Sequence, residues 1–162
     1  MEEKPGIERE IELNRFIEDI GLFFEKMGLP RMAGRILGVL LICEPPEQSI
    51  TEIGQRLNAS KSSISIMTRL LLEKGLIERA PSPLPRQDYY RFKPGGWIVY
   101  MRQWLETMSA LHAITERGMV LLDDNSPGAR ENLMEAHDLF SMMEEELPAM
   151  LAKMEEERRR RG

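Results

Sequence analysis

Several kinds of residue and segment are scarce in this chain of 162 residues, and each scarcity excludes a class of protein. A single cysteine, Cys43, excludes an internal disulfide and fits a reducing compartment. No uninterrupted apolar run approaches the ~20 residues that a membrane-spanning helix needs. The amino-terminal stretch "MEEKPGIEREIE" is acidic and lacks an apolar signal core. We therefore expect a cytoplasmic protein with no membrane partner.

Residue groupings that carry catalysis or bind cofactors are also missing. The sequence has no Ser-His-Asp grouping, no phosphate-binding loop and no dinucleotide-binding fingerprint. His112 and His137 stand on separate segments, and neither has a companion three or four residues away that completes a metal set. Cys43 follows an apolar stretch that looks buried, which is typical of an inert thiol. We therefore expect no enzymatic activity, no cofactor and no metal.

Charge is distributed unevenly along the chain, which has a net charge of −5. An acidic protein is not expected to coat nucleic acid indiscriminately. Residues 49–97, however, carry eight basic and four acidic side chains, whereas residues 98–162 carry eight basic and thirteen acidic ones. One basic segment therefore lies between two acidic arms.

Helical patterns with clear boundaries occupy the first third of the chain. Apolar residues recur at helical spacing over 7–27, and a second, more apolar helix is predicted at 31–43, between Pro30 and Pro45. Ser49 then opens an S-x-x-E capping box, which predicts the start of a third helix.

The stretch "SKSSISIMTRLLLEKG" predicts a fourth helix, which Ser60 can cap at its start and Gly75 at its end. Two strand candidates, 76–80 and 88–93, flank a proline-containing loop and predict a hairpin. This order of elements is the winged form of the helix-turn-helix. We therefore predict a mainly α fold with a small β-hairpin, a winged helix-turn-helix with long N- and C-terminal dimerisation helices.

Two long helices are predicted in the last third of the chain, each with an apolar stripe at steps of three and four residues. One winged domain is too small to cover such a stripe, so a second copy of the chain is the expected cover. An intramolecular hairpin of the two helices is the alternative, and both arrangements can hold at once. The predicted divisions are an arm at 1–29, the winged domain at 30–96 and a dimerisation region at 97–162.

The two faces of the predicted fourth helix differ in chemistry. On a helical wheel Ile64 and Leu71 fall on one side, whereas Ser62, Ser65, Ile66 and Arg69 fall on the other, with Lys61 in the first turn. Small hydroxyl side chains allow a helix to approach the DNA major groove, and its amino-terminal N–H groups attract phosphate. An arginine can bind guanine, and an isoleucine can touch a thymine methyl group.

The predicted hairpin adds basic residues to this surface. Arg86 lies near its tip, where it can enter a minor groove, and Gln87 offers a polar contact. The simpler interpretations are an ordinary solvated helix cap and a solvated hairpin. A winged-helix adaptor that binds proteins and never DNA is a further alternative. An adaptor should lack basic and hydroxyl residues on this helix, and this sequence has both.

Two stretches, "GLPRMAGRILGVLLICEPPEQSITEIGQRLNASKSSISIMTRLLLEKGLIER" and "RQDYYRFKPGGW", resemble the MarR-type winged-helix transcription regulators, in particular their GbsR-like branch. Residues 28–97 carry the resemblance. It implies a homodimer joined through its terminal helices, and repression or activation by binding double-stranded operator DNA, often relieved by a small molecule. By this resemblance the recognition-helix contacts are Ser60, Lys61, Ser62, Ser63, Ser65 and Arg69, and the wing contact is Arg86.

A small-molecule effector, if the family pattern holds, needs an apolar pocket. Methionines adapt to irregular apolar shapes, and aromatic residues add surface. The ordinary alternative for each such residue is core or interface packing. The candidate pocket residues are Phe23, Phe24, Met101, Trp104 and Met108.

Overall fold

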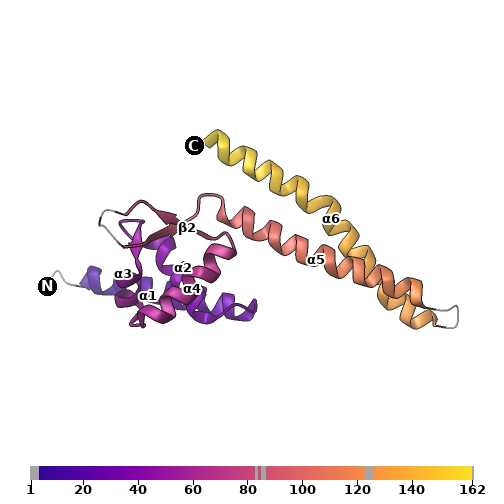
Figure 1. The fold of residues 1–162 in the computed structure, drawn as a ribbon, viewed down its shortest axis with the longest axis horizontal. Helices are drawn as coiled ribbons and strands as arrows, with labels where there is room; N and C mark the ends of the chain where they lie inside the picture. The colour runs from indigo at the N-terminus through magenta and orange to yellow at the C-terminus, as the bar shows by residue number, and fades with distance from the viewer. Residues whose placement is uncertain (1–3, 83, 85–86, 123–125, 162) are drawn as a thin grey trace. The chain divides into compact units, whose positions relative to one another are not determined.

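The computed structural model describes residues 4–82, 84, 87–122 and 126–161. The chain forms two compact units, Met1–Gly96 and Trp97–Gly162. Over the residues that the structure describes, unit 1 contains four helices and a small sheet, and unit 2 contains two long helices (Figure 1). The predicted fold class, mainly α with a winged helix-turn-helix, is confirmed.

Helix α1 (Lys4–Lys26) packs closely against α2 (Arg31–Ile42), and glycines make the close approach possible. A Cβ added at Gly34 would lie 2.8 Å from the Cα of Gly21 on α1, a distance that real Cβ atoms do not show. One at Gly38 would lie 3.1 Å from the Cα of Ile17. Both helices belong to unit 1, so the predicted arm at 1–29 packs on the predicted winged domain at 30–96.

An acidic side chain of α1 reinforces this helix pair. Glu18 accepts hydrogen bonds from Arg31 at 2.8 Å and from Arg35 at 2.6 Å. Burial acts to raise the pKa of Glu18, but the two arginines outweigh it and the pKa is lowered. The carboxylate therefore stays charged between two cations of α2.

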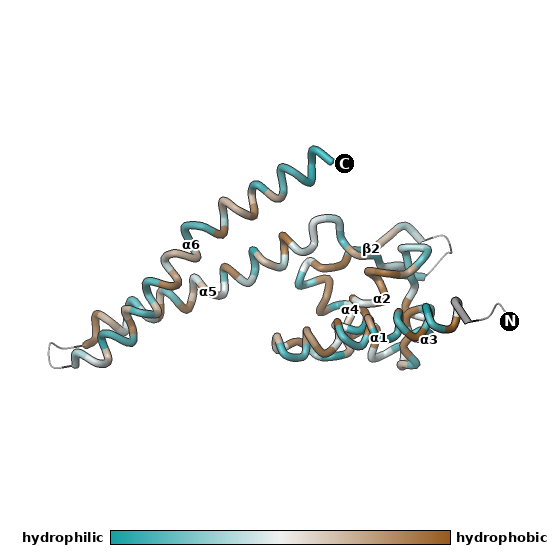
Figure 2. Tube along the Cα trace, turned by 180° about the vertical axis from the view of Figure 1, so that it is seen from behind, coloured by the Kyte–Doolittle hydropathy of each residue, from teal (hydrophilic) through white to brown (hydrophobic). Residues whose placement is uncertain are grey.

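Helices α3 (Ile50–Leu57) and α4 (Lys61–Glu73) form the helix-turn-helix. The predicted capping box is confirmed, because the Glu52 amide donates to the Ser49 hydroxyl and the Ser49 amide to the Glu52 carboxylate. The core of unit 1 lies between these helices and α2, which is hydrophobic along most of its length (Figure 2). Its fully buried side chains include Ile36, Leu37, Ile53, Ile64, Leu71 and Leu76.

The wing is a three-stranded antiparallel sheet in the order β1-β3-β2. The predicted hairpin is confirmed as β2 (Ile77–Ala80) and β3 (Tyr89–Phe92). Sequence reasoning missed β1 (Gln48–Ser49), because a strand of two residues is too short to show an alternating pattern. Adjacent Tyr89 and Tyr90 are both buried, so both faces of the sheet are covered at this point.

In unit 2, α5 (Gly96–Leu121) and α6 (Pro127–Arg161) form an intramolecular helical hairpin (Figure 1). Gly118 of α5 lies against Leu133 of α6, and farther along the pair Arg102 donates to Glu155 at 2.7 Å. Pro148 lies inside helix α6, which is continuous from Pro127 to Arg161. Within the described residues, no helix combines the length and the apolar character that crossing a bilayer requires.

Candidate nucleic-acid interface

The turn before α4 exposes the amino-terminal end of that helix. Asn58 adopts a left-handed conformation with φ of 49°, and the Ala59 amide donates to the Gly54 carbonyl at 2.9 Å. A Cβ at Gly54 would lie 3.0 Å from the Ala59 carbonyl oxygen, so a small residue keeps the turn tight. Ser60 then caps α4 by accepting a hydrogen bond from the Ser63 amide at 3.2 Å, as the sequence predicts.

The structure separates the two faces of α4 as the helical wheel predicts. Ile64, Thr68 and Leu71 are buried against the rest of unit 1. Ile66 is 54% exposed, so it lies on the outward face with the polar residues. The outward face also carries hydroxyl groups and an arginine: Ser60, Lys61, Ser62 and Arg69 are exposed, and Ser63 and Ser65 are half-buried.

Contacts among these polar side chains are few and weak. The Ser60 and Ser62 hydroxyls lie 3.1 Å apart, and the Arg69 guanidinium lies 3.5 Å from the Ser65 hydroxyl, at the outer limit of a hydrogen bond. Arg69 therefore keeps most of its hydrogen-bonding capacity for a ligand.

A hollow of about 520 Å³ joins α4 to the wing. Lys61, Ser62 and Ser65 line it from α4, and Gln87 and Asp88 line it from the segment before β3. Gln87 is exposed, as its predicted role requires. Arg86, the predicted wing contact, lies outside the described residues.

Two other wing arginines are engaged with carboxylates. Arg79 lies 3.6 Å from a carboxylate oxygen of Asp88. Arg91 donates to Glu78 at 2.7 Å, and these hydrogen bonds and charges raise the pKa of Arg91 further. Arg91 is therefore a poorer DNA ligand than its position in the hairpin suggests.

Sequence reasoning missed a second hollow, of about 470 Å³, beside the first turn of α4. Thr51, Gln55 and Asn58 line it next to Ser60 and Lys61. The signal was present, because Thr51 and Gln55 are four residues apart and so share one face of α3. These polar side chains extend the exposed surface from α4 onto α3.

Comparison with known proteins identifies the family of this chain. A family model described as "MmpR5-like MarR family transcriptional regulator" matches residues 95–157, and one described as "MarR family" matches residues 27–88. The HTH-type transcriptional regulator MmpR5 of Mycobacterium tuberculosis is 36% identical over 135 residues, which cover 83% of this chain and 82% of that protein. The chain belongs to the MarR family of transcriptional regulators.

Two further relatives of this MarR-family chain are also described as transcriptional regulators. The putative HTH-type transcriptional regulator YvaV of Bacillus subtilis is 25% identical over 144 residues, which cover 83% of this chain and 81% of that protein. A crystal structure described only as that of a transcriptional regulator is 33% identical, with a TM-score of 0.75 over 90% of this chain and 99% of that one. The expectation that the protein is not an enzyme is confirmed, because its relatives are transcriptional regulators.

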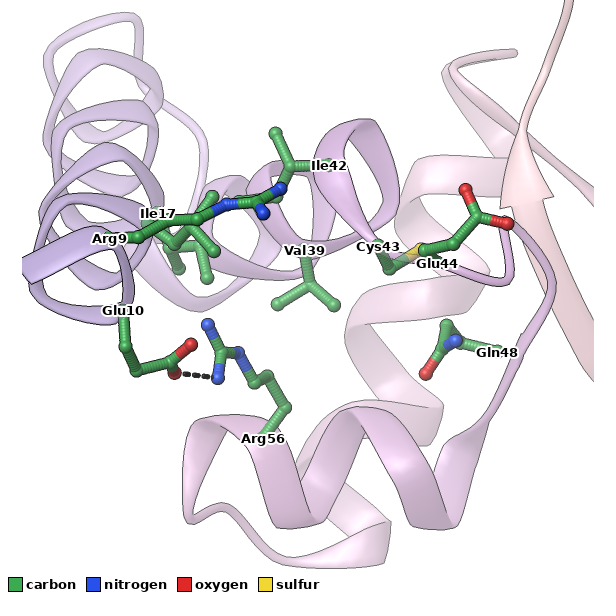
Figure 3. A pocket seen from close by; sticks show the side chains of 10 residues that line it. Arg9, Glu10, Ile17, Val39, Ile42, Cys43, Glu44, Gln48 and Arg56 are labelled. Atoms are coloured by element: carbon green, nitrogen blue, oxygen red, sulfur yellow. Dashed lines mark hydrogen bonds and ion pairs between the residues drawn. The ribbon is translucent and has the colours of Figure 1, made fainter. Parts of the chain in front are cut away.

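Unit 1 of this MarR-family protein contains a pocket of about 320 Å³ among α1, α2 and α3. Apolar side chains such as Ile17 and Val39 line it together with charged ones (Figure 3). At one side Arg56 reaches from α3 to form an ion pair with Glu10 of α1 (Figure 3). A pocket of this size is at the small end of the range for ligand sites.

None of the predicted effector-pocket residues lines this pocket. Phe24 is fully buried in unit 1, in edge contact with the exposed ring of Phe23, so for Phe24 the alternative of core packing fits better. Met101, Trp104 and Met108 are half-buried on α5 in unit 2.

Cys43, at the end of α2, lines the same pocket and is half-buried. Burial, together with nearby carboxylates such as Glu44, raises the pKa of the Cys43 thiol to about 11. The reactive thiolate is therefore scarce at neutral pH, in agreement with the expected inert cysteine.

The prediction that the two histidines are isolated is wrong, because α5 and α6 bring them together. His112 Nε2 lies 2.8 Å from His137 Nδ1 and 3.2 Å from the Ser141 hydroxyl. On its other side, His112 Nδ1 lies 2.9 Å from a carboxylate oxygen of Glu144. Hydrogen bonds from Ser109 and His112 lower the pKa of Glu144, so this carboxylate is charged. Sequence reasoning failed here because residues 25 positions apart meet only when the hairpin closes.

Proposed function

We propose that this MarR-family protein is a homodimeric, sequence-specific binder of double-stranded DNA that represses transcription and responds to a small-molecule effector. The observation that carries the proposal is the exposed face of α4, where a capped helix end presents Lys61, Ser62 and Arg69. Each chain inserts one α4 into a major groove, and two copies read half-sites about 34 Å apart. A dimer bound near a promoter blocks polymerase.

The chemistry of α4 suits this role. Hydroxyl groups and unpaired N–H groups in its first turn bind phosphate oxygens, and the helix dipole favours negative charge there. Arg69 lies two turns farther along, where it can donate to guanine O6 and N7. Gln87 borders the same hollow as Ser62, so the wing and α4 can contact one DNA segment. Arg86 remains the predicted minor-groove contact.

Salt dependence of binding tests the proposal. Duplex DNA fragments should first be selected from genomic DNA by the protein, and the affinity for a selected fragment then measured between about 50 and 200 mM salt. We expect the affinity to fall by about tenfold or more, because bound basic groups displace counterions from the phosphates. A flat response, or no selection of fragments, would instead favour the protein-binding adaptor.

The homodimer is supported by apolar side chains that a single chain leaves in solvent. On α5 and α6 these include Ile114, Leu139 and Met142, and on α1 they include Ile11 and Phe23. Contact with a second copy of the chain would remove these side chains from water, which is favourable.

Met142→Glu should shift the protein from dimer to monomer. Met142 is 64% exposed in the single chain, so a charge there should not disturb the hairpin but should be costly in a buried interface. Sedimentation equilibrium measures the mass, and Met142→Leu is the matched control that should stay dimeric. A dimer that survives Met142→Glu would place the interface on other residues.

Two finer parts of the proposal, the effector site and the family branch, come from the sequence alone. The effector would act through Phe23, Met101, Trp104 and Met108, which stay predictions. The GbsR-like branch also stays a prediction, because the matching models are described as MarR and MmpR5-like.

A further inference from the structure

The histidine cluster of unit 2 offers three metal-ligating atoms from two helices. Glu116 lies one turn after His112 on α5, and its carboxylate Oε1 is 4.0 Å from His112 Nε2 and 3.9 Å from His137 Nδ1. The three ligand atoms lie within 4.8 Å of one another. We propose that His112, His137 and Glu116 bind one divalent transition-metal ion of the Zn²⁺ type, which joins α5 to α6. This proposal does not depend on DNA binding.

The distances are close to those of a tetrahedral zinc site. With zinc–ligand bonds of about 2.0–2.2 Å, neighbouring ligand atoms lie about 3.3–3.5 Å apart. The two ring nitrogens, at 2.8 Å, would separate by about half an ångström, and the carboxylate would approach by a similar amount. Glu116 is exposed, so its side chain is able to make this adjustment.

The surroundings of His112 match those of a metal ligand. His112 is buried, and its Nδ1 lies 2.9 Å from a carboxylate oxygen of Glu144. A carboxylate on the outer nitrogen holds the proton there and leaves the Nε2 lone pair for the metal. The Ser141 hydroxyl, 3.2 Å from Nε2, is placed to hold a water in the fourth position. Two imidazoles with one carboxylate are a ligand set that Zn²⁺ accepts.

A metal-free function for the same cluster is the competing interpretation. At 2.8 Å the two ring nitrogens can share one proton, and the resulting hydrogen bond alone would hold the helices together. The two interpretations differ in a measurable way, because only the metal site takes up one ion per chain. The chain has only these two histidines, so a site with two imidazole ligands needs both.

Metal uptake by the full-length protein tests the proposal. The protein should be prepared without a histidine tag, stripped with a chelator and titrated with Zn²⁺ against a chromogenic competitor. We expect one ion per chain and a higher melting temperature with Zn²⁺, because an ion that binds only the folded state stabilises it. Co²⁺ in place of Zn²⁺ should give the visible absorption of a tetrahedral site. Absence of stoichiometric uptake would overturn the proposal and favour the shared proton.

Substitutions assign the ligands. Glu116→Gln should weaken Zn²⁺ binding by about tenfold or more, and His137→Ala should weaken it more strongly. Even the loss of a residue that only hydrogen-bonds to a metal ligand costs about 10–100-fold in affinity. Glu106→Gln, an exposed carboxylate elsewhere on α5, is the matched control and should bind as the unmodified protein does. Circular dichroism verifies that each variant is helical. If His137→Ala does not fold, Glu116→Gln and the Co²⁺ spectrum decide. Equal binding by Glu116→Gln and Glu106→Gln would overturn the assignment.

Discussion

Arg69→Glu is expected to lower the affinity for a selected DNA fragment by about a hundredfold or more. Loss of an arginine that reads guanine costs about 1–3 kcal/mol, and a like charge beside the phosphates adds to that loss. Arg69 is exposed on the outward face of α4 and has only a weak contact to Ser65, so the fold should not change. Fluorescence anisotropy at fixed salt measures the effect.

Two further variants serve as controls for the result with Arg69→Glu. Arg117→Glu makes the same charge change at an exposed position on α5 and should affect binding much less. Arg69→Ala separates the two possible roles of the arginine. A loss confined to certain sequences would show that it reads a base, whereas an equal loss on all sequences would show that it binds phosphate. Unchanged binding by Arg69→Glu would contradict the proposed orientation of α4 in the groove.

Gly34→Ala is expected to destabilise unit 1 by about 1–3 kcal/mol. The new methyl group would lie 2.8 Å from the Cα of Gly21 and from the carbonyl oxygen of Ile20. Both are backbone atoms, so no change of rotamer can relieve the clash. The helices must therefore separate and lose packing around Phe24. Urea denaturation of the full chain, followed by circular dichroism, measures the loss.

Gly6→Ala is the matched control for this experiment. The change is the same and falls on α1, but nothing lies within 4 Å of the added Cβ. Because alanine favours helix over glycine by up to about 1 kcal/mol, this variant should be unchanged or slightly more stable. Equal effects at the two positions would mean that the helices do not approach each other as closely as described.

The elements that the sequence predicted correctly are those with local signals. The capping box at Ser49, the cap at Ser60 and the stop at Gly75 depend on residues within one helical turn, so they are readable without the fold. The two faces of α4 followed from helical periodicity alone. The family resemblance over 28–97 rested on these same residues.

Strand β1 and the histidine cluster escaped prediction because they depend on residues distant in sequence. β1 exists only because Gln48 and Ser49 pair with the tyrosines of β3. The histidine cluster forms only when α5 and α6 fold back on each other. The spacing of His112 and His137 in the sequence does not predict that they will meet.

The packing of α1 on α2 also bears on regulation. Glu18 accepts hydrogen bonds from Arg31 and Arg35, the glycines bring the backbones of α1 and α2 close together, and α2 in turn packs on α4. In the proposed dimer, a tilt of α1 would therefore carry α2 with it, and with α2 the helix α4 that is proposed to read DNA.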